Sequence, residues 1–246
     1  MTRLVNRETE LDPGEDEGEP DVAFVLLLAI IVVFGLEAAS GTFASRSADP
    51  LTKADKLIRI GGEYGPLIRE RGEWWRLFSA TFLHANFAHI ACNGIALVFA
   101  GYALERAIGR AWFAAIFTLG GLAGGLFSLA LNKPEVVSVG ASGAIMGLFA
   151  GALALSFRYD WDTKRSKNLR SGAWMVLIPS LIPTLSGKTD IASHFGGTIA
   201  GGVIGLVLLA LWRDEEPRPP FPRGAAVFAF LGLCGTLFAF GKVIFG

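Results

Sequence analysis

The sequence predicts an all-α fold, a polytopic bundle of seven transmembrane helices. Of its 246 residues, 52% are hydrophobic and only 18% are charged, and the mean hydropathy is +0.49. The apolar residues form runs close to the roughly 20 residues that cross about 30 Å of hydrocarbon as a helix. The seven runs lie near residues 22–39, 83–104, 111–131, 140–157, 172–186, 190–212 and 224–245.

The residues before the first run form an acidic tail, 1–21, which contains "ETELDPGEDEGEPD". We expect this tail to be solvated and disordered. The first run is not a signal peptide, because a signal peptide begins with a basic region. The loop 40–82 mixes apolar and basic residues, and we expect it to be structured and to lie at the membrane interface.

The basic residues predict the orientation of the bundle, because Lys and Arg gather in short loops on the cytoplasmic side. With the N-terminus inside, the inside segments hold 12 basic residues and the short outside segments hold 3. The long loop 40–82 is an exception, with 7. We therefore expect a multi-pass protein of a plasma or bacterial inner membrane, with a cytoplasmic N-terminus and the C-terminus outside.

Composition argues against several functional classes. The net charge is zero and basic residues do not cluster, so we expect no nucleic-acid partner. The chain has no HExxH motif, and its acidic residues lie at the edges of the runs rather than deep within them. This pattern argues against a zinc protease, an aspartyl protease and a carboxylate proton relay, and we expect no metal and no cofactor. Cys92 and Cys234 are expected to pack in the bundle without forming a disulfide.

Polar residues occur in three runs that would enter from the same side of the membrane. "HANFAHIACNG" contains His84, His89 and Asn93, while Ser142 begins the fourth run and His194 lies near the start of the sixth. Polar residues at bilayer depth are costly and usually functional. On one helix, His89 and Asn93 would be about 40° apart, whereas His84 would point about 140° away from His89, toward the outer loop.

Two interpretations of Ser142 are open. It begins "SGAIMGLFAG", in which Gly143 starts a stripe of glycines at four-residue intervals that is typical of helix packing. A serine becomes a nucleophile only with a base within reach. His194 is a candidate base, and it shares a helix face with Gly201. The first turn of a helix also offers unpaired N–H groups that favour an anion.

Several short motifs occur together in a specific order. They are Trp75-Arg76, His84-x4-His89-x3-Asn93, Gly140-Ala141-Ser142-Gly143 and His194 followed by Gly196-Gly197. This combination, which spans the first six runs, resembles the rhomboid intramembrane serine proteases. The resemblance implies a six-helix core at 22–212, followed by a linker and a seventh helix at 213–246.

The resemblance also implies a role for each candidate residue. Ser142 would be the nucleophile and His194 the general base, while Asn93, His89 and Ser142 would stabilise the oxyanion. Residues with a structural role near the site would be His84, Trp75, Arg76, Gly140, Gly143, Gly197 and Gly201. The substrates would be transmembrane proteins in the lipid bilayer, cleaved near the outer face.

Two alternatives to proteolysis are open. A non-proteolytic rhomboid-like protein that binds membrane clients is the main one, although the intact Ser142 and His194 weigh against it. A transporter would carry polar residues at the midplane of several helices and internal repeats, and neither is visible. The run 172–186, with Pro179 and Pro183, is either a helix shortened to match thin lipid or a movable gate. The sequence specifies no oligomeric state.

Overall fold

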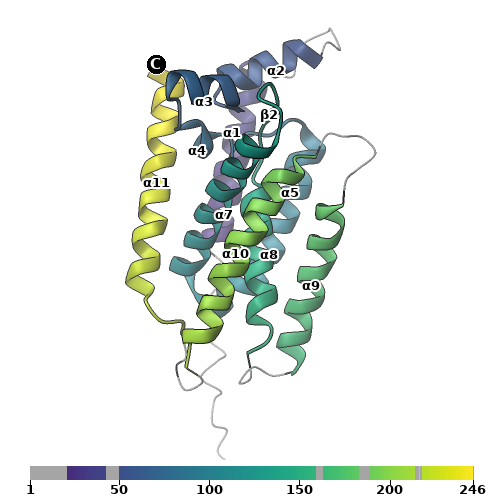
Figure 1. Ribbon diagram of the computed structural model, residues 1–246, viewed down its shortest axis with the longest axis vertical. Helices are drawn as coiled ribbons and strands as arrows, with labels where there is room; N and C mark the ends of the chain where they lie inside the picture. The colour runs from purple at the N-terminus through teal and green to yellow at the C-terminus, as the bar shows by residue number, and fades with distance from the viewer. Residues whose placement is uncertain are drawn as a thin grey trace, which may run out of the picture.

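The described residues are mostly helical, which confirms the predicted all-α bundle (Figure 1). The computed structural model describes residues 21–42, 50–158, 163–182, 189–213, 216 and 218–245. The acidic tail, apart from Asp21, lies outside these residues.

Five helices within the described residues are long and apolar enough to cross a membrane. Their ends lie within four residues of the predicted runs. They are α1 (Asp21–Ala39), the continuous helix Phe87–Ile108, α7 (Arg110–Leu131), α10 (Ile191–Leu211) and α11 (Pro222–Phe245). The second of these consists of α5 (Phe87–Ala100), a π-helical turn η1 (Gly101–Glu105) and α6 (Arg106–Ile108). The described chain starts at one end of the bundle, and α11 finishes at the other (Figure 1).

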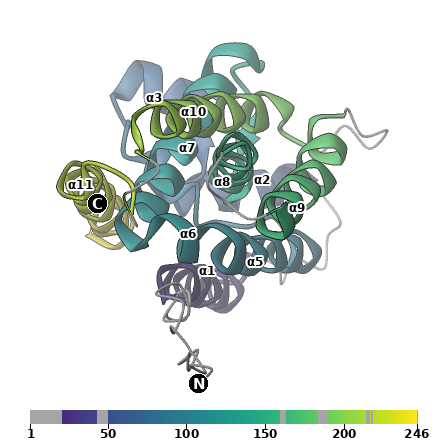
Figure 2. The ribbon, with the colours of Figure 1, turned by 90° about the horizontal axis from the view of Figure 1, so that it is seen from below.

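Helix α8 (Ser142–Leu155) is shorter than the predicted run 140–157. Its 14 residues give a length of about 21 Å, less than the thickness of the hydrocarbon. Figure 2 shows α8 end-on, with α7, α9 and α10 around it. Because nearly all of its residues are buried against these neighbours, α8 does not need to match the thickness of the lipid.

Helix α9 (Thr163–Leu181) begins nine residues before the predicted run. The first eight residues of the helix include four basic ones, so apolarity alone did not detect the start of the helix. The basic residues are Lys164, Arg165, Lys167 and Arg170. Pro179 lies inside the helix, whereas Pro183 and the predicted end at 186 lie outside the described residues.

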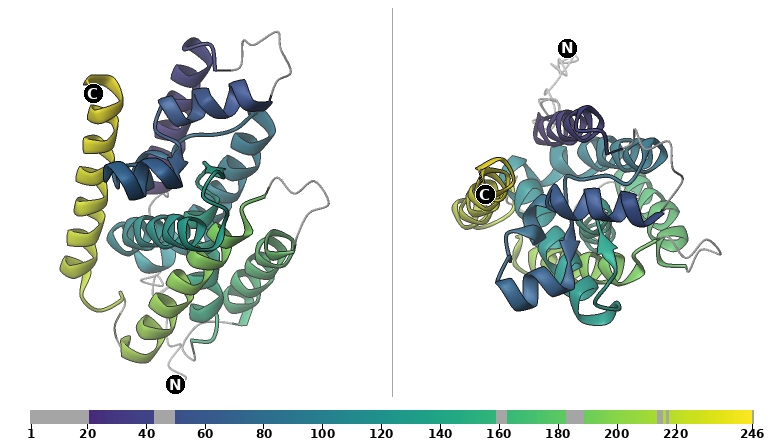
Figure 3. Two further views of the ribbon diagram at one scale, coloured as in Figure 1. Left: turned by 45° about the horizontal axis from the view of Figure 1, so that its top comes forward. Right: turned by 90° about the horizontal axis from the view of Figure 1, so that it is seen from above.

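Residues 50–82, which belong to the predicted interfacial loop, form a layer of short helices across the ends of the long ones, where α11 also ends (Figures 1 and 3). The layer contains α2 (Pro50–Arg59), α3 (Gly65–Arg71) and α4 (Arg76–Ser79). Strand β1 (Glu63–Tyr64) pairs antiparallel with β2 (Val137–Ser138), and Glu63 lies opposite Ser138. This pairing ties the layer to the segment that leads into α8.

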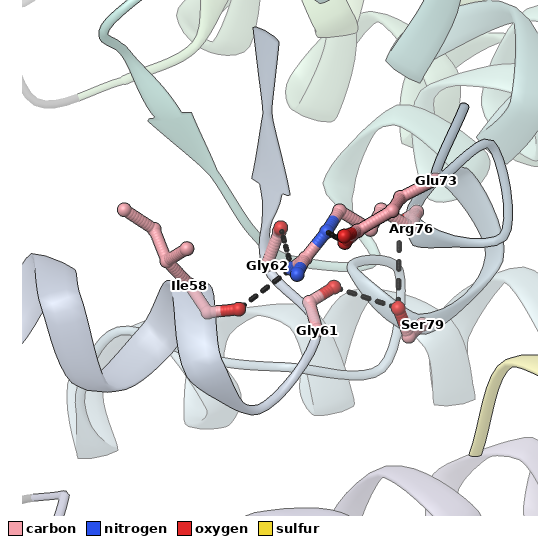
Figure 4. Close-up of polar contacts among 6 residues, drawn as sticks. All are labelled: Ile58, Gly61, Gly62, Glu73, Arg76 and Ser79. Atoms are coloured by element: carbon pink, nitrogen blue, oxygen red, sulfur yellow. Dashed lines mark hydrogen bonds and ion pairs between the residues drawn. The ribbon is translucent and has the colours of Figure 1, made fainter. Parts of the chain in front are cut away.

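Arg76 holds the layer together from its centre (Figure 4). Its Nη1 donates to the backbone oxygens of Ile58, at 2.6 Å, and Gly62, at 2.9 Å, and its Nε donates to Glu73 at 2.7 Å. The guanidinium carbon also lies 4.6 Å from the centre of the Trp75 ring. Because the side chain is buried, removing it would leave these carbonyl groups without a partner.

The predicted glycine stripes of α8 and α10 face each other. A Cβ atom at Gly197 would overlap the carbonyl oxygen of Gly143, and a Cβ at Gly201 would overlap that of Gly147. Both contacts connect residues four apart on each helix, so α8 and α10 run parallel in backbone contact. Packing of small residues is the usual way in which membrane helices approach this closely.

We predict that Gly201→Ala strongly destabilises the protein, because the new methyl group must push the two backbones apart. Overpacking of this kind costs about 1–3 kcal/mol, and a displaced backbone raises that cost. Gly202→Ala is the matched control, since its Cβ would meet only the Ala150 side chain, at 3.9 Å. Thermal unfolding in detergent should show a lower midpoint for Gly201→Ala and an unchanged or higher one for Gly202→Ala. Equal midpoints would contradict the close contact.

Candidate active site

The candidate residues come from helices that begin at the same end of the bundle, below the layer of short helices (Figure 1). His89 and Asn93 lie on α5, Ser142 is the first residue of α8, and His194 lies in the first turn of α10. This end is opposite to the one at which α1 begins. The site is therefore built where three helix N-termini converge.

Ser142 and His194 lie beside the contact between α8 and α10. Ser142 directly precedes Gly143, whose carbonyl abuts Gly197, and His194 lies one turn before Gly197. The neighbouring Ser193 packs directly on Gly143, because a Cβ there would lie 2.7 Å from the Ser193 Oγ. The structure thus brings the starts of the two helices together, which helical angles alone did not establish.

The imidazole of His194 is buried, and one of its nitrogens has a fixed partner. Its Nδ1 lies 2.7 Å from the backbone oxygen of Ser180, near the end of α9. A carbonyl oxygen can only accept a hydrogen bond, so this partner assigns the proton to Nδ1. In the neutral ring Nε2 then carries a free lone pair, which a general base requires.

His89 and Asn93 lie against the turn that leads into α8. Gly140 has a φ of +126°, which favours glycine. A Cβ at Gly140 would lie 2.6 Å from the His89 ring and 3.5 Å from Nδ2 of Asn93. Both predicted oxyanion ligands therefore border Gly140, which lies two residues before Ser142 in the chain.

The predicted direction of His84 is wrong, because the helix does not extend back to that residue. Asn86 adopts an extended conformation and caps α5, its Oδ1 accepting the N–H of His89 at 2.9 Å. The chain before Asn86 turns so that the His84 ring lies 5.0 Å from the His89 ring, centre to centre. His84 therefore faces the site and not the outer loop.

The fully buried His84 is hydrogen-bonded on both sides of its ring. Its Nδ1 lies 3.1 Å from the carbonyl oxygen of Phe82, and its Nε2 lies 3.0 Å from Nδ2 of Asn93. The carbonyl must accept from Nδ1, so Nε2 must accept from the Asn93 amide. The second hydrogen on that amide is then left to donate elsewhere.

Acidic residues cap helices and anchor loops at both ends of the bundle. Glu37 accepts the N–H of His84 at 3.0 Å, and Glu105 accepts the first N–H groups of α1 at 2.8 Å. Asp190 caps α10 by accepting the N–H of Ser193 at 3.0 Å. We did not predict this cap, although an Asp just before an apolar helix is a known signal for it.

Asp190 belongs to a buried polar cluster with Glu63, beneath the layer of short helices. Asn132 and Ser138 donate to its carboxylate at 2.8 and 2.5 Å. Burial would raise the pKa of Asp190, but hydrogen bonds from Ser138, Ser128, Ser193 and Asn132 hold it below its usual value. Burial and the nearby Asp190 raise the pKa of Glu63 to about 8. At neutral pH the cluster therefore carries one negative charge, on Asp190.

Metal-binding geometry is not found in the described ranges, where no three His, Cys, Asp or Glu side chains converge. Cys92 and Cys234 are both exposed and unpaired. This end of the bundle brings together a serine, three histidines and an asparagine amide.

Comparison with known proteins places this arrangement in a family. Residues 71–211 match the Rhomboid domain model. The chain is 39% identical to RHOMBOID-like protein 5 of Arabidopsis thaliana over 62% of its own length and 50% of that protein. It is 30% identical to Rhomboid-like protease 1 of Toxoplasma gondii, over 75% of the chain and 64% of the relative. It is also 30% identical to Rhomboid protease GluP of Bacillus subtilis, over 75% of the chain and 34% of the relative.

The chain thus covers between a third and two thirds of the length of these relatives. The matched domain accounts for more than half of the chain and includes the candidate residues on α5, α8 and α10. This multi-pass membrane protein belongs to the rhomboid family.

Proposed function

We propose that this protein is an intramembrane serine endopeptidase that cleaves transmembrane proteins near the outer face of the membrane. The observation that carries the proposal is the backbone contact between Gly143 and Gly197, because it places the first turn of α8 beside the buried His194. The names of two relatives, from Toxoplasma and Bacillus, include the word protease, which agrees with this assignment.

In the proposed reaction, Ser142 attacks the carbonyl carbon of the scissile peptide bond. Nε2 of His194 takes the hydroxyl proton as the new C–O bond forms, and then gives it to the leaving amine as the C–N bond breaks. A water molecule, activated in the same way, releases the acyl group and restores Ser142. The pair needs no carboxylate, provided that another group orients the imidazole.

The oxyanion that forms during attack would be stabilised from two sides. Nδ2 of Asn93 and the ring of His89 border the turn at Gly140, just before Ser142. The unpaired N–H groups in the first turn of α8 add the positive end of a helix dipole. Donors fixed before the reaction stabilise the transition state most, and His84 fixes the amide of Asn93.

Membrane orientation decides on which side cleavage occurs. The site lies at the end of the bundle opposite to the start of α1 (Figure 1). With the cytoplasmic N-terminus that the basic residues predict, the site lies toward the exterior and the C-terminus is also outside. Substrates would then be cut in the outer half of their membrane span.

We predict that Ser142→Ala and His194→Ala each lower kcat by at least about 10³-fold, because the two residues act as one unit. The measurement is cleavage of a transmembrane model substrate by purified protein in proteoliposomes. A fluorophosphonate probe should label the wild type and not Ser142→Ala. Ser193→Ala serves as a folding control beside His194. Cleavage by Ser142→Ala would exclude the mechanism, and a wild type that neither cleaves nor reacts would favour a non-proteolytic client-binding protein.

We predict that His84 acts on catalysis through Asn93. Loss of the Asn93 side chain should lower kcat by about 10²–10³-fold with little change in KM. His84→Ala frees the amide and should lower kcat by about tenfold. The double variant should be no slower than Asn93→Ala, since the two losses are not independent. Additive losses would show that His84 acts separately. The control is Cys92→Ala, because Cys92 is exposed and lies on the same helix as Asn93.

We predict opposite accessibility for the two ends of the bundle. In a chain with Cys92 and Cys234 replaced by Ala, a membrane-impermeant maleimide added outside should label Glu135→Cys and leave Lys167→Cys unlabelled. Both positions are exposed, and permeabilised cells provide the control for reactivity. The reverse labelling pattern would show that the bundle has the opposite orientation, with the site on the cytoplasmic side.

A further inference from the structure

The hydrogen bond between His194 and α9 is the least expected contact of the site. It joins Nδ1 of a ring on α10 to the backbone oxygen of Ser180, 14 residues earlier in the chain, at 2.7 Å. No side chain takes part on the α9 side. The partner of the proposed base is therefore a main-chain group whose position depends on where α9 lies.

The carbonyl of Ser180 is free to accept this bond because α9 ends one residue later, at Leu181. The last four carbonyl groups of a helix have no partner within the helix. Ser180 also follows the buried stripe of α9, formed by Leu169, Ala173 and Leu177, one turn beyond its last member. The stripe packs α9 against the bundle and thereby presents the end of the helix to His194.

The acidic side chain nearest to His194 in sequence is not available for this role. Both oxygens of Asp190 are occupied by Asn132, Ser138 and the start of α10 itself. The end of α9 offers a different kind of partner, because the C-terminal end of a helix carries a partial negative charge. This charge favours the positive imidazolium that forms when Nε2 takes a proton.

We propose that the backbone carbonyl of Ser180 orients the catalytic base, holding the proton of His194 on Nδ1 so that Nε2 faces Ser142. This inference rests on the proposed function and assigns Ser180 as a positioning residue. It follows that His194 is oriented only while α9 is packed against the bundle. If the end of α9 separated from α10, the imidazole of His194 would lose this hydrogen bond. Its Nε2 would then no longer be held toward Ser142, and His194 could not act as the base.

An amide-to-ester replacement tests the proposal without changing any side chain. Incorporating the α-hydroxy analogue of leucine at position 181 makes the Ser180 carbonyl an ester, which is a weaker acceptor. The same replacement at Ile182 weakens the neighbouring carbonyl and is the matched control. We expect the ester at 181 to lower kcat about three- to tenfold with unchanged KM, and the ester at 182 to have little effect. Equal effects at both positions would overturn the proposal.

The tautomer of His194 provides a test that does not depend on activity. The chain has only three histidines, so ¹⁵N spectra of histidine-labelled protein can be assigned with His194→Gln. We expect the resting protein to hold the Nδ1–H tautomer at His194. An Nε2–H tautomer would refute the orienting role even if the protein cleaves substrate. If the spectra show the Nδ1–H tautomer but the Ser142→Ala variant still cleaves substrate, the proposed mechanism is refuted. The hydrogen bond between His194 and Ser180 would nevertheless be supported.

Discussion

The site depends on the backbone contact between α8 and α10. In lipid, apolar side chains gain little by leaving one apolar environment for another, so helices associate through close packing and polar contacts. The glycines at 143, 147, 197 and 201 let the two backbones touch, which fixes the register of the helices as well as their distance. That register brings Ser142 and His194 to the same level, so a packing stripe and a candidate catalytic pair have one structural cause.

A second constraint holds the starts of these helices in place from above. Arg76 ties the short helices to Gly62, the residue before β1, and Glu63 of β1 lies opposite Ser138 on β2. Ser138 in turn donates to Asp190, the cap of α10. The chain of contacts links the loop 40–82 to the first turn of the helix that carries His194. Because Glu63 keeps its proton at neutral pH, the buried cluster avoids repulsion between two carboxylates.

The features that follow from local chemistry could be predicted from the sequence. Hydropathy located the long helices, and glycine spacing indicated which faces touch. Features that depend on tertiary structure could not be predicted in this way. Helix α8 is short because neighbouring helices surround it in place of lipid. His84 turns toward the site because Asn86 caps α5, which begins at Phe87. The cap at Asp190 had a sequence signal that was overlooked. The carbonyl of Ser180 had none, since every residue carries the same main-chain group.

A carbonyl suits this position better than the carboxylate of a serine protease triad. A buried carboxylate beside His194 would carry a full charge in a low-dielectric environment, and such a group needs several hydrogen bonds to offset its desolvation. Asp190, the acid at the start of α10, is stabilised in that way, by a helix N-terminus and by side-chain donors. The end of α9 instead supplies a dipole that orients the ring without adding a charge. It gives less stabilisation to an imidazolium than a carboxylate would, and it makes the proposed base depend on the packing of a neighbouring helix.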